Sequence, residues 1–315
     1  MLVDTPANPL PKGAISTEIT TPDGVTLRTA RWPLEGTQRL GTVCLFQGRG
    51  EYIEKYFETV GELRARGFAV ATLDWRGQGG SERLLKNPLK GHVDSFADYV
   101  TDLKTFMEQI VLPECPPPYY VLAHSMGGLV LFLAEPLLRN SFERMVFTSP
   151  LFGLGPMYHP VGAARAATKI LASLGLRKSF PPGESKVMTD FLPFAGNPVT
   201  SDAVRFARNA DVLRNAPQLA LGSPTIGWAN AAFKAMEQVS DATYSPRIAV
   251  PIMMIAAGAD KVVSNIAIEH VVVGLRAGSR IVLPGAQHEI LQERSVFREQ
   301  FYAAFDAFIP GSPVY

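Results

Sequence analysis

Residues 120–130 read Tyr120-Val121-Leu122-Ala123-His124-Ser125-Met126-Gly127-Gly128-Leu129-Val130. An apolar run typical of a buried strand stops at Ser125, and a helical run from Gly127 to Leu138 begins directly after it. A serine on such a sharp strand-to-helix turn projects from the sheet edge, and the helix start aims backbone N–H groups at whatever the serine attacks. The turn needs small neighbours, which Gly127 and Ala123 provide, although glycine is more usual in place of Ala123. The stretch therefore predicts a nucleophile elbow centred on Ser125.

Length and composition indicate a globular protein with a large core. The 315 residues are 47% hydrophobic, which suits one large α/β domain or two ordinary ones. The net charge of +1 gives no reason to expect nucleic acid as a partner. No apolar run approaches the roughly 20 residues that span a bilayer, and residues 1–13 carry no signal segment. These features predict a soluble, cytoplasmic protein.

Cysteine and histidine patterns point away from metal chemistry. Cys44 lies in an apolar strand run and Cys115 in a proline-rich loop, so we expect one core thiol and one loop thiol rather than a disulfide. No pair of Cys or His has the spacing of metal ligands. We expect neither a metal nor another cofactor.

Strand and helix patterns alternate on both sides of the elbow. A hairpin is predicted around Asp23-Gly24, and buried strands are predicted at Gly41–Phe46 and Phe68–Trp75. Further strands are predicted at Arg144–Thr148, Pro251–Ala257 and Arg280–Leu283. Helices are expected at Glu54–Arg66, Phe96–Ile110, Ile266–Leu275 and Val296–Phe308. This order predicts the α/β class, with a mostly parallel sheet covered by helices on both faces.

The alternation breaks between residues 155 and 248, where only helical runs appear, at Val161–Leu174, Ala203–Asn215 and Trp228–Val239. We therefore expect a core domain formed by residues 1–154 and 249–315. Residues 155–248 are expected to form a helical insertion before the last two strands.

A serine hydroxyl is a poor nucleophile at neutral pH unless a base activates it and a third group orients that base. Asp260 follows the predicted strand Pro251–Ala257, and His288 follows the next strand. Parallel strands place such loops at one sheet edge, and the order Ser125, Asp260, His288 is the order found in α/β hydrolases. The sequence predicts Ser125 as nucleophile, His288 as base and Asp260 as its orienter.

Other candidates for these roles have simpler explanations. We expect His92 to hold a loop, His124 to point away from the site, and His159 and His270 to be exposed or structural. Asp74 also ends a strand, but its neighbours indicate a hydrogen-bonded loop anchor.

A tetrahedral intermediate needs N–H donors for its oxyanion. One should come from Met126, directly after the nucleophile, and another from the loop Gly48-Arg49-Gly50, where glycines allow close approach to substrate.

Several motifs together resemble one family. They are Gly48-Arg49-Gly50-Glu51-Tyr52, Asp74-Trp75-Arg76-Gly77-Gln78-Gly79, Gly91-His92-Val93-Asp94-Ser95-Phe96, His124-Ser125-Met126-Gly127-Gly128, Gly258-Ala259-Asp260 and Gln287-His288-Glu289. As a set they resemble the α/β-hydrolase fold, and more narrowly the monoacylglycerol lipases and bacterial lysophospholipases, which are classified with the serine aminopeptidases. The resemblance covers nearly the whole chain.

This resemblance implies a serine hydrolase with Ser125, Asp260 and His288 as its triad and with Arg49 and Met126 as oxyanion donors. It also implies that residues 155–248 form a lid or cap over the site. Many relatives have histidine where this chain has Gln47, and the lysophospholipase-like members with Gly-Arg followed by Glu are more similar here.

The cap is the guide to substrate. Its large apolar residues could line an acyl channel or form the cap's own helix core: Met157, Tyr158, Phe191, Phe194, Trp228, Phe233 and Met236. Gly48, Trp228 and Phe233 are the pocket residues that we predict. Residues 155–248 hold ten Lys and Arg against six Asp and Glu, which suits transient contact with a lipid surface or an ordinary solvated surface.

Three functions stay open on the sequence alone. The first is hydrolysis of single-chain lipid esters or similar medium-sized esters, with short-chain carboxylesters as a variant. The second is removal of an N-terminal amino acid, which requires acidic groups that bind a free amine. The third is a binding module without turnover, and acyl transfer to an acceptor other than water would use the same site.

Overall fold

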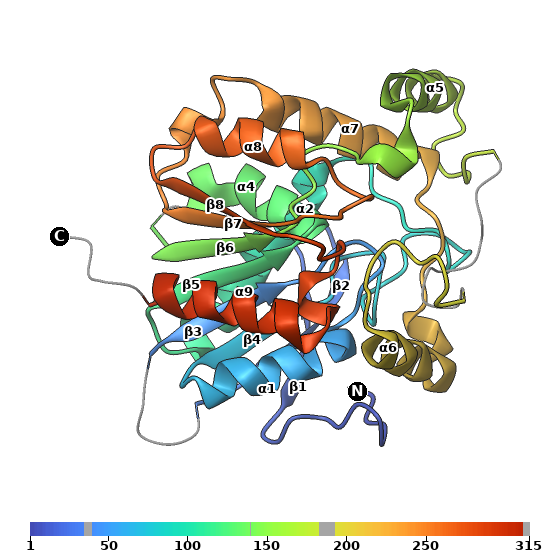
Figure 1. Ribbon diagram of the computed structural model, residues 1–315. Coiled ribbons are helices and arrows are strands. Elements are labelled where there is room, and N and C mark those ends of the chain that lie inside the picture. Colours follow the sequence, from blue (N-terminus) through green and yellow to red (C-terminus); the bar gives the residue numbers. More distant parts are fainter. Residues whose placement is uncertain (35–39, 139, 183–192, 311–315) are drawn as a thin grey trace.

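The computed structural model describes residues 1–34, 40–138, 140–182 and 193–310. One eight-stranded sheet runs through the molecule with helices on both faces (Figure 1). Its strands are β1 (Ile15–Thr20), β2 (Thr26–Trp32), β3 (Thr42–Phe46), β4 (Ala69–Leu73), β5 (Tyr119–His124), β6 (Arg144–Thr148), β7 (Ile252–Ala257) and β8 (Gly278–Leu283). The spatial order is β1-β2-β4-β3-β5-β6-β7-β8.

Strand direction confirms the predicted α/β class. The hairpin strands β1 and β2 pair antiparallel, as do β2 and β4, while every pair from β4 across to β8 is parallel. The elbow strand β5 lies between β3 and β6, so its carboxyl end opens at the middle of one sheet edge. Loops that follow parallel strands meet at this edge.

Helices cover the two faces of the sheet through separate apolar clusters (Figure 1). One face packs against α1 (Phe57–Ala65) and α9 (Ser295–Phe308). The other packs against α2 (Phe96–Phe106), α4 (Met126–Leu138) and α8 (Asn265–Val273). Cys44 and Cys115 are both buried and neither forms a disulfide, as the sequence predicted.

Helix ends follow local hydrogen bonding. Ser95 caps α2 as predicted, because its side chain accepts from the Ala97 N–H and Asp98 completes a capping box. The helix expected to reach Ile110 leaves α geometry after Phe106 and continues as a π-helical turn, Met107–Val111. The helix expected from Glu54 begins with a 3₁₀ turn, Ile53–Tyr56, before α1.

The insertion between β6 and β7 contains α5 (Val161–Ser173), α6 (Ala203–Asn215) and α7 (Ile226–Ser240), and none of its described residues joins the sheet. These are the three helical runs that the sequence predicted. Helix α7 packs against α2, α4 and α8, and its apolar side chains belong to the main cluster of the core. Helix α5 packs on α7 at one end of the molecule (Figure 1).

Among the described residues, no helix is both long and apolar enough to cross a membrane.

Candidate active site

The elbow forms where β5 meets α4. Ser125 has a φ of 50°, a left-handed conformation that residues other than glycine rarely adopt. Its N–H donates to the Thr148 carbonyl at 3.0 Å, and its own carbonyl accepts from Leu151 at 3.0 Å. These bonds hold a strained turn in place, as expected for a nucleophile presented at a sheet edge.

Gly127 makes the close approach of α4 to β3 feasible. A Cβ atom there would lie 2.6 Å from the Phe46 carbonyl oxygen and 2.8 Å from the Gln47 carbonyl oxygen. Both atoms belong to backbone, so they cannot rotate away as a side chain would. This close contact explains why position 127 needs a small residue, as the sequence predicted.

We expect Gly127→Ala to lower the free energy of unfolding by about 2 to 3 kcal/mol, because the added methyl group overpacks fixed backbone. Gly61→Ala is the matched control, since Gly61 lies in α1 with nothing within 4 Å of an added Cβ. That control should gain about 0.5 to 1 kcal/mol from helix propensity. Urea unfolding of both variants tests the prediction, and equal stabilities would contradict it.

Three side chains from three loops form one hydrogen-bonded chain. His288 Nε2 lies 3.1 Å from Ser125 Oγ, and His288 Nδ1 lies 2.8 Å from Asp260 Oδ2. The other oxygen of Asp260 accepts N–H bonds from Val262 and Val263. The structure thus brings together the three residues that the sequence selected, in the geometry of a nucleophile, a base and an orienting acid.

The surroundings of the pair favour the charged forms of His288 and Asp260. Burial opposes an imidazolium, but the charge and hydrogen bond of Asp260, helped by Glu289 and Glu51, raise the pKa of His288 above its ordinary value. Burial also opposes an ionised carboxyl at Asp260, yet His288 and the two backbone N–H groups lower its pKa. A base of this kind can accept the Ser125 proton while its partner stays ionised.

The predicted oxyanion loop is fixed on both sides of Arg49. The Gly48 N–H donates to Glu51 Oε2, and the Gly50 N–H donates to Gln78 Oε1 at 3.2 Å. Gln78 in turn donates to the carbonyl oxygens of Gly48 and Glu51. Since the Gly48 N–H is occupied, the next N–H along, that of Arg49, is the donor that we assign to this loop.

The second predicted donor, Met126, is the first residue of α4. The first N–H groups of a helix have no acceptor within that helix, and they concentrate its positive end. A Cβ on Gly48 would lie 3.2 Å from Ser125 Cβ, so the loop and the elbow face each other closely.

Gln47, directly before the oxyanion loop, is buried. Its side chain donates to Asp74 Oδ1 at 3.0 Å, and its carbonyl accepts from Trp75 Nε1. Asp74 also binds Arg28 and the N–H groups of Ile53 and Gly80. The predicted role of Asp74 as a loop anchor is therefore confirmed.

The prediction that His124 points away from the site was wrong. Its ring lies 4.8 Å from the His288 ring, while its Nδ1 faces Thr148. Burial, opposed by the nearby Glu51, lowers the pKa of His124 to about 4, so the ring is neutral at pH 7. Alternation along β5 should turn His124 opposite to Ala123, but its place at the strand's last residue lets the ring reach the His288 loop.

The remaining histidines lie as expected. His92 is buried and its Nδ1 lies 2.9 Å from Thr225 Oγ1, which joins its loop to the start of α7. His159 and His270 are exposed. None of these three takes part in the Ser125 chain of hydrogen bonds.

Helix α7 of the insertion contacts the loop that carries Arg49. Its buried side chains belong to the main core of the protein. Trp228 Nε1 donates to Tyr99 OH at 3.0 Å, and the Arg49 guanidinium lies 5.1 Å from the centre of the Trp228 ring. Phe233, which the sequence predicts as a pocket residue, and Met236, for which channel and core roles stay open, are both buried in the main apolar cluster. Met157, Tyr158 and Phe194 are exposed, and Phe191 lies outside the described residues.

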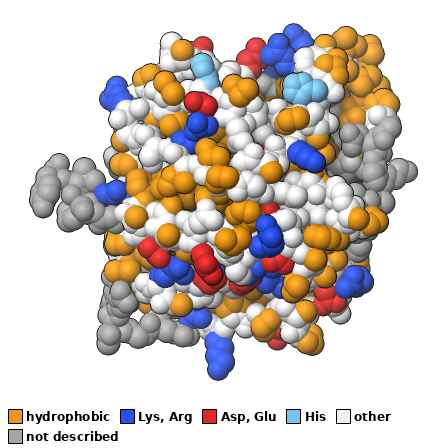
Figure 2. Space-filling view, viewed as in Figure 1, with side chains coloured by type: hydrophobic (Ala, Val, Ile, Leu, Met, Phe, Trp, Pro, Cys, Tyr) orange, Lys and Arg blue, Asp and Glu red, His pale blue; other side chains and the backbone are white. Residues whose placement is uncertain are grey.

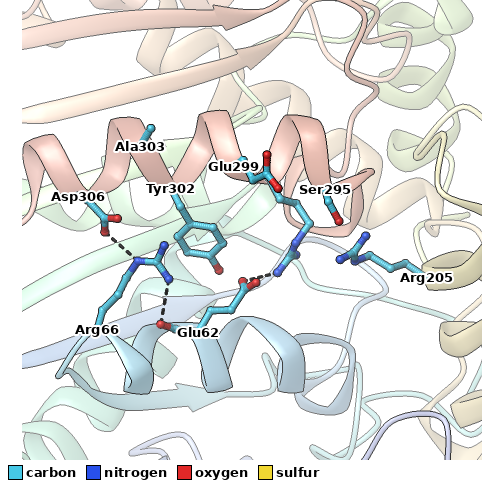
Figure 3. A pocket seen from close by; sticks show the side chains of 9 residues that line it. Glu62, Arg66, Arg205, Ser295, Glu299, Tyr302, Ala303 and Asp306 are labelled. Atoms are coloured by element: carbon cyan, nitrogen blue, oxygen red, sulfur yellow. Dashed lines mark hydrogen bonds and ion pairs between the residues drawn. The ribbon is translucent and has the colours of Figure 1, made fainter.

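A surface pocket of about 400 Å³ lies between α1 and α9, away from Ser125 (Figure 3). Its walls are ion pairs: Arg66 with Asp306, and Arg298 with Glu62. Four of its charged side chains thus pair with one another, and none of the triad residues lines it, which argues against a substrate site. No group of three potential metal ligands occurs in the part of the chain that the structure describes.

Comparison with known proteins agrees with this geometry. A family model described as serine aminopeptidase, S33, matches residues 37–295. Lysophospholipase L2 of Escherichia coli (strain K12) is 32% identical over 302 residues, covering 92% of this chain and 86% of that protein.

Solved structures show the same fold. A soluble variant of monoglyceride lipase from Saccharomyces cerevisiae aligns with a TM-score of 0.75 at 17% identity, covering 95% of this chain and 94% of that one. A carboxyl esterase from Bacillus coagulans aligns with a TM-score of 0.74 at 18% identity, covering 95% and 99%. With the elbow, the hydrogen-bonded serine, histidine and aspartate, and the family match over most of its length, the chain belongs to the serine aminopeptidase (S33) family of α/β hydrolases.

Proposed function

We propose that this protein is a carboxylic-ester hydrolase that cleaves the acyl ester of single-chain lipids, lysophospholipids or monoacylglycerols, through an acyl-enzyme on Ser125. The observation that carries the proposal is the continuous hydrogen-bonded chain from Ser125 through His288 to Asp260. The similarity to a lysophospholipase over nearly the full length supports the substrate class.

The arrangement supports a two-step acyl transfer. Ser125 Oγ attacks the ester carbonyl while His288 Nε2 takes its proton, and the N–H groups of Arg49 and Met126 stabilise the oxyanion. The imidazolium then returns the proton to the departing alcohol. In the second step, water gives a proton to His288 and attacks the acyl carbonyl. The bond between Ser125 Oγ and the acyl carbon then breaks, the imidazolium returns the proton to Oγ, and the fatty acid is released.

The peptidase alternative is weaker because the acids of the insertion are engaged elsewhere. Each acid in the described part of residues 155–248 pairs with a residue of that same insertion: Asp202 with Arg205, Asp211 with Arg214, Glu237 with Arg165, and Asp241 with Thr243. Among the described residues of the insertion, a free amine would therefore find no carboxylate without a partner. An ester has no such requirement.

Exposed apolar side chains of the insertion support contact with a lipid surface. Figure 2 shows apolar side chains gathered at the upper right, where Figure 1 places α5. The exposed apolar residues on and beside this helix are Met157, Tyr158, Ile170, Leu174 and Leu176. Arg165 and Lys169 lie on the same helix. We propose that residues 155–248 act as a cap whose α5 region contacts a membrane surface transiently, in a cytoplasmic protein.

The fall of kcat/KM at acidic pH, the acid limb of the pH profile, should report protonation of His288. Its pKa is raised, so activity should fall on acidification around a midpoint above about 6.5, the ordinary imidazole value. Asp260 has a lowered pKa and stays ionised throughout that range. A pH profile with a soluble ester measures the midpoint, and a value below 6 would contradict the assignment.

The experiment that tests the function measures fatty-acid release from a lysophospholipid and from a monoacylglycerol, with Ser125→Ala as control. Release from either substrate, lost in the variant, supports the lipid-ester function and identifies the head group. Release from neither, with short activated esters still cleaved, would leave a short-chain carboxylesterase. If a fluorophosphonate failed to label Ser125, the protein would be a binding module.

A further inference from the structure

A buried lysine lies between the two loops that carry the candidate catalytic groups. Lys55 follows the oxyanion loop in sequence, and its side chain is 2% exposed. Its Nζ lies 3.1 Å from Glu51 Oε1 and 2.8 Å from Glu289 Oε1. One ammonium group thus bridges residues that are more than 230 positions apart in the sequence.

Glu51 connects the lysine to the oxyanion loop. Its other oxygen, Oε2, accepts from the Gly48 N–H and from Tyr56 OH. Gly48 precedes Arg49, and the same residue lies against Ser125. The position of the Arg49 N–H relative to Ser125 therefore depends on where Glu51 holds Gly48.

Glu289 connects the lysine to the base, because it directly follows His288. A second bond strengthens this connection, since Gln292 Nε2 donates to the Lys55 carbonyl at 2.9 Å. The Glu289 N–H also donates to the Val199 carbonyl of the insertion. The His288 loop is thus held to the 3₁₀ turn before α1 through both the side chain and the backbone of Lys55.

Burying three charges in one cluster is costly, since each loses its hydration, and stability alone gives little reason to keep them. Burial opposes the ionised form of Glu51, but Lys55, together with His124 and two hydrogen bonds, outweighs it and lowers the pKa of Glu51 to about 2, so this carboxyl stays ionised. The cluster carries a net charge of −1 beside the His288 ring. A negative charge there favours the imidazolium that forms during acyl transfer.

We propose that Lys55 is a positioning residue whose ammonium, through Glu51 and Glu289, holds the oxyanion loop and the His288 loop in register. The same two carboxylates lie beside His288, and their charge favours its protonated form. The inference rests on the proposed serine-hydrolase function. Lys55, Glu51 and Glu289 do not touch the reacting atoms and act only through Gly48 and His288.

Two variants separate the charge effect from the positioning effect. Glu289→Gln removes one negative charge, so the midpoint of the acid limb of kcat/KM should fall by about 0.5 to 1 pH. The double variant Lys55→Met with Glu289→Gln restores the net charge of −1 but removes the bridge. Its midpoint should lie near the wild-type value, while kcat falls by about 10- to 100-fold with KM changed far less, because the oxyanion donors are misplaced.

Arg76→Met is the matched control. Arg76 is an equally buried cation, 3% exposed, that pairs with Asp23 and Asp102 away from the site. Its loss should lower the melting temperature without moving the acid limb. An unmoved limb in Glu289→Gln would overturn the charge effect, and a wild-type kcat in the folded double variant would overturn the positioning effect. If the double variant does not fold, the kcat of Glu289→Gln decides the positioning effect, because an amide binds the Lys55 ammonium more weakly than a carboxylate does; a wild-type kcat there would overturn it.

The rate at which a fluorophosphonate labels Ser125, measured across pH, keeps this test separate from the substrate assignment. Labelling uses the same base and the same oxyanion donors but needs no lipid substrate. If wild type hydrolyses none of the esters yet is labelled, the limb shifts still test Lys55. If neither hydrolysis nor labelling occurs, the proposed function fails, and the positioning proposal fails with it.

Discussion

The Ser125→Ala variant is expected to lose roughly 10⁵- to 10⁶-fold in kcat for ester hydrolysis, because the acyl-enzyme can no longer form. Ser125 Oγ is the only hydroxyl that the structure places within hydrogen-bonding distance of His288 among the described residues. Fatty-acid release at saturating substrate measures the loss. The fold should be unaffected, since alanine adds no atom to the elbow.

Ser149→Ala is the control for that experiment. Ser149 is also buried and also has a left-handed φ, 43°, at the end of the neighbouring strand β6. Among the described residues its hydroxyl has no hydrogen-bond partner, so its removal should leave kcat within about twofold of wild type. Comparable losses in both variants would show that the strained turns, rather than the Ser125 hydroxyl, support activity.

The Asp260→Asn variant should lose about 10⁴-fold in kcat while keeping its loop. The amide oxygen can still accept from the Val262 and Val263 N–H groups, as Oδ1 of the aspartate does at 2.8 and 3.0 Å. The amide cannot stabilise the imidazolium, however, and its NH₂ group would favour the wrong tautomer of His288. Steady-state kinetics with an activated ester measures the loss.

Asp260→Ala distinguishes catalysis from loop structure. This variant also loses the acceptor for two backbone N–H groups, so it should melt at a lower temperature than Asp260→Asn, while the two have similarly low kcat. An Asn variant that keeps more than a tenth of wild-type kcat would show that another carboxylate orients His288.

The residues of the central site could be predicted because each is set by local sequence at a strand end. The elbow at Ser125 is a strand-to-helix switch within a few residues, and Asp260 and His288 follow the strands β7 and β8 in chain order. Parallel pairing then brings all three loops to the same edge. The meeting of these loops depends on strand order and direction, and not on how individual side chains pack.

The residues around that site could not be predicted in the same way. The contact between Lys55 and Glu289 joins the first and last parts of the chain, and its geometry depends on how α1 and the His288 loop pack. His124 was misplaced because strand alternation does not fix a side chain at the last residue of a strand. The motifs Gly50-Glu51-Tyr52 and Gln287-His288-Glu289 held the only signal, two acids beside the expected site.

The packing of α7 has a consequence for engineering and for the divergence of such enzymes. Trp228 and Phe233 complete the same apolar cluster as α2 and α4, so a chimera that exchanges residues 155–248 as a block would remove part of its host's core. Loss of the Trp228 side chain alone costs about 3 to 5 kcal/mol on the scale of large core truncations. Exchangeable sequence is therefore confined to the α5 side of the insertion, which contributes little to the core.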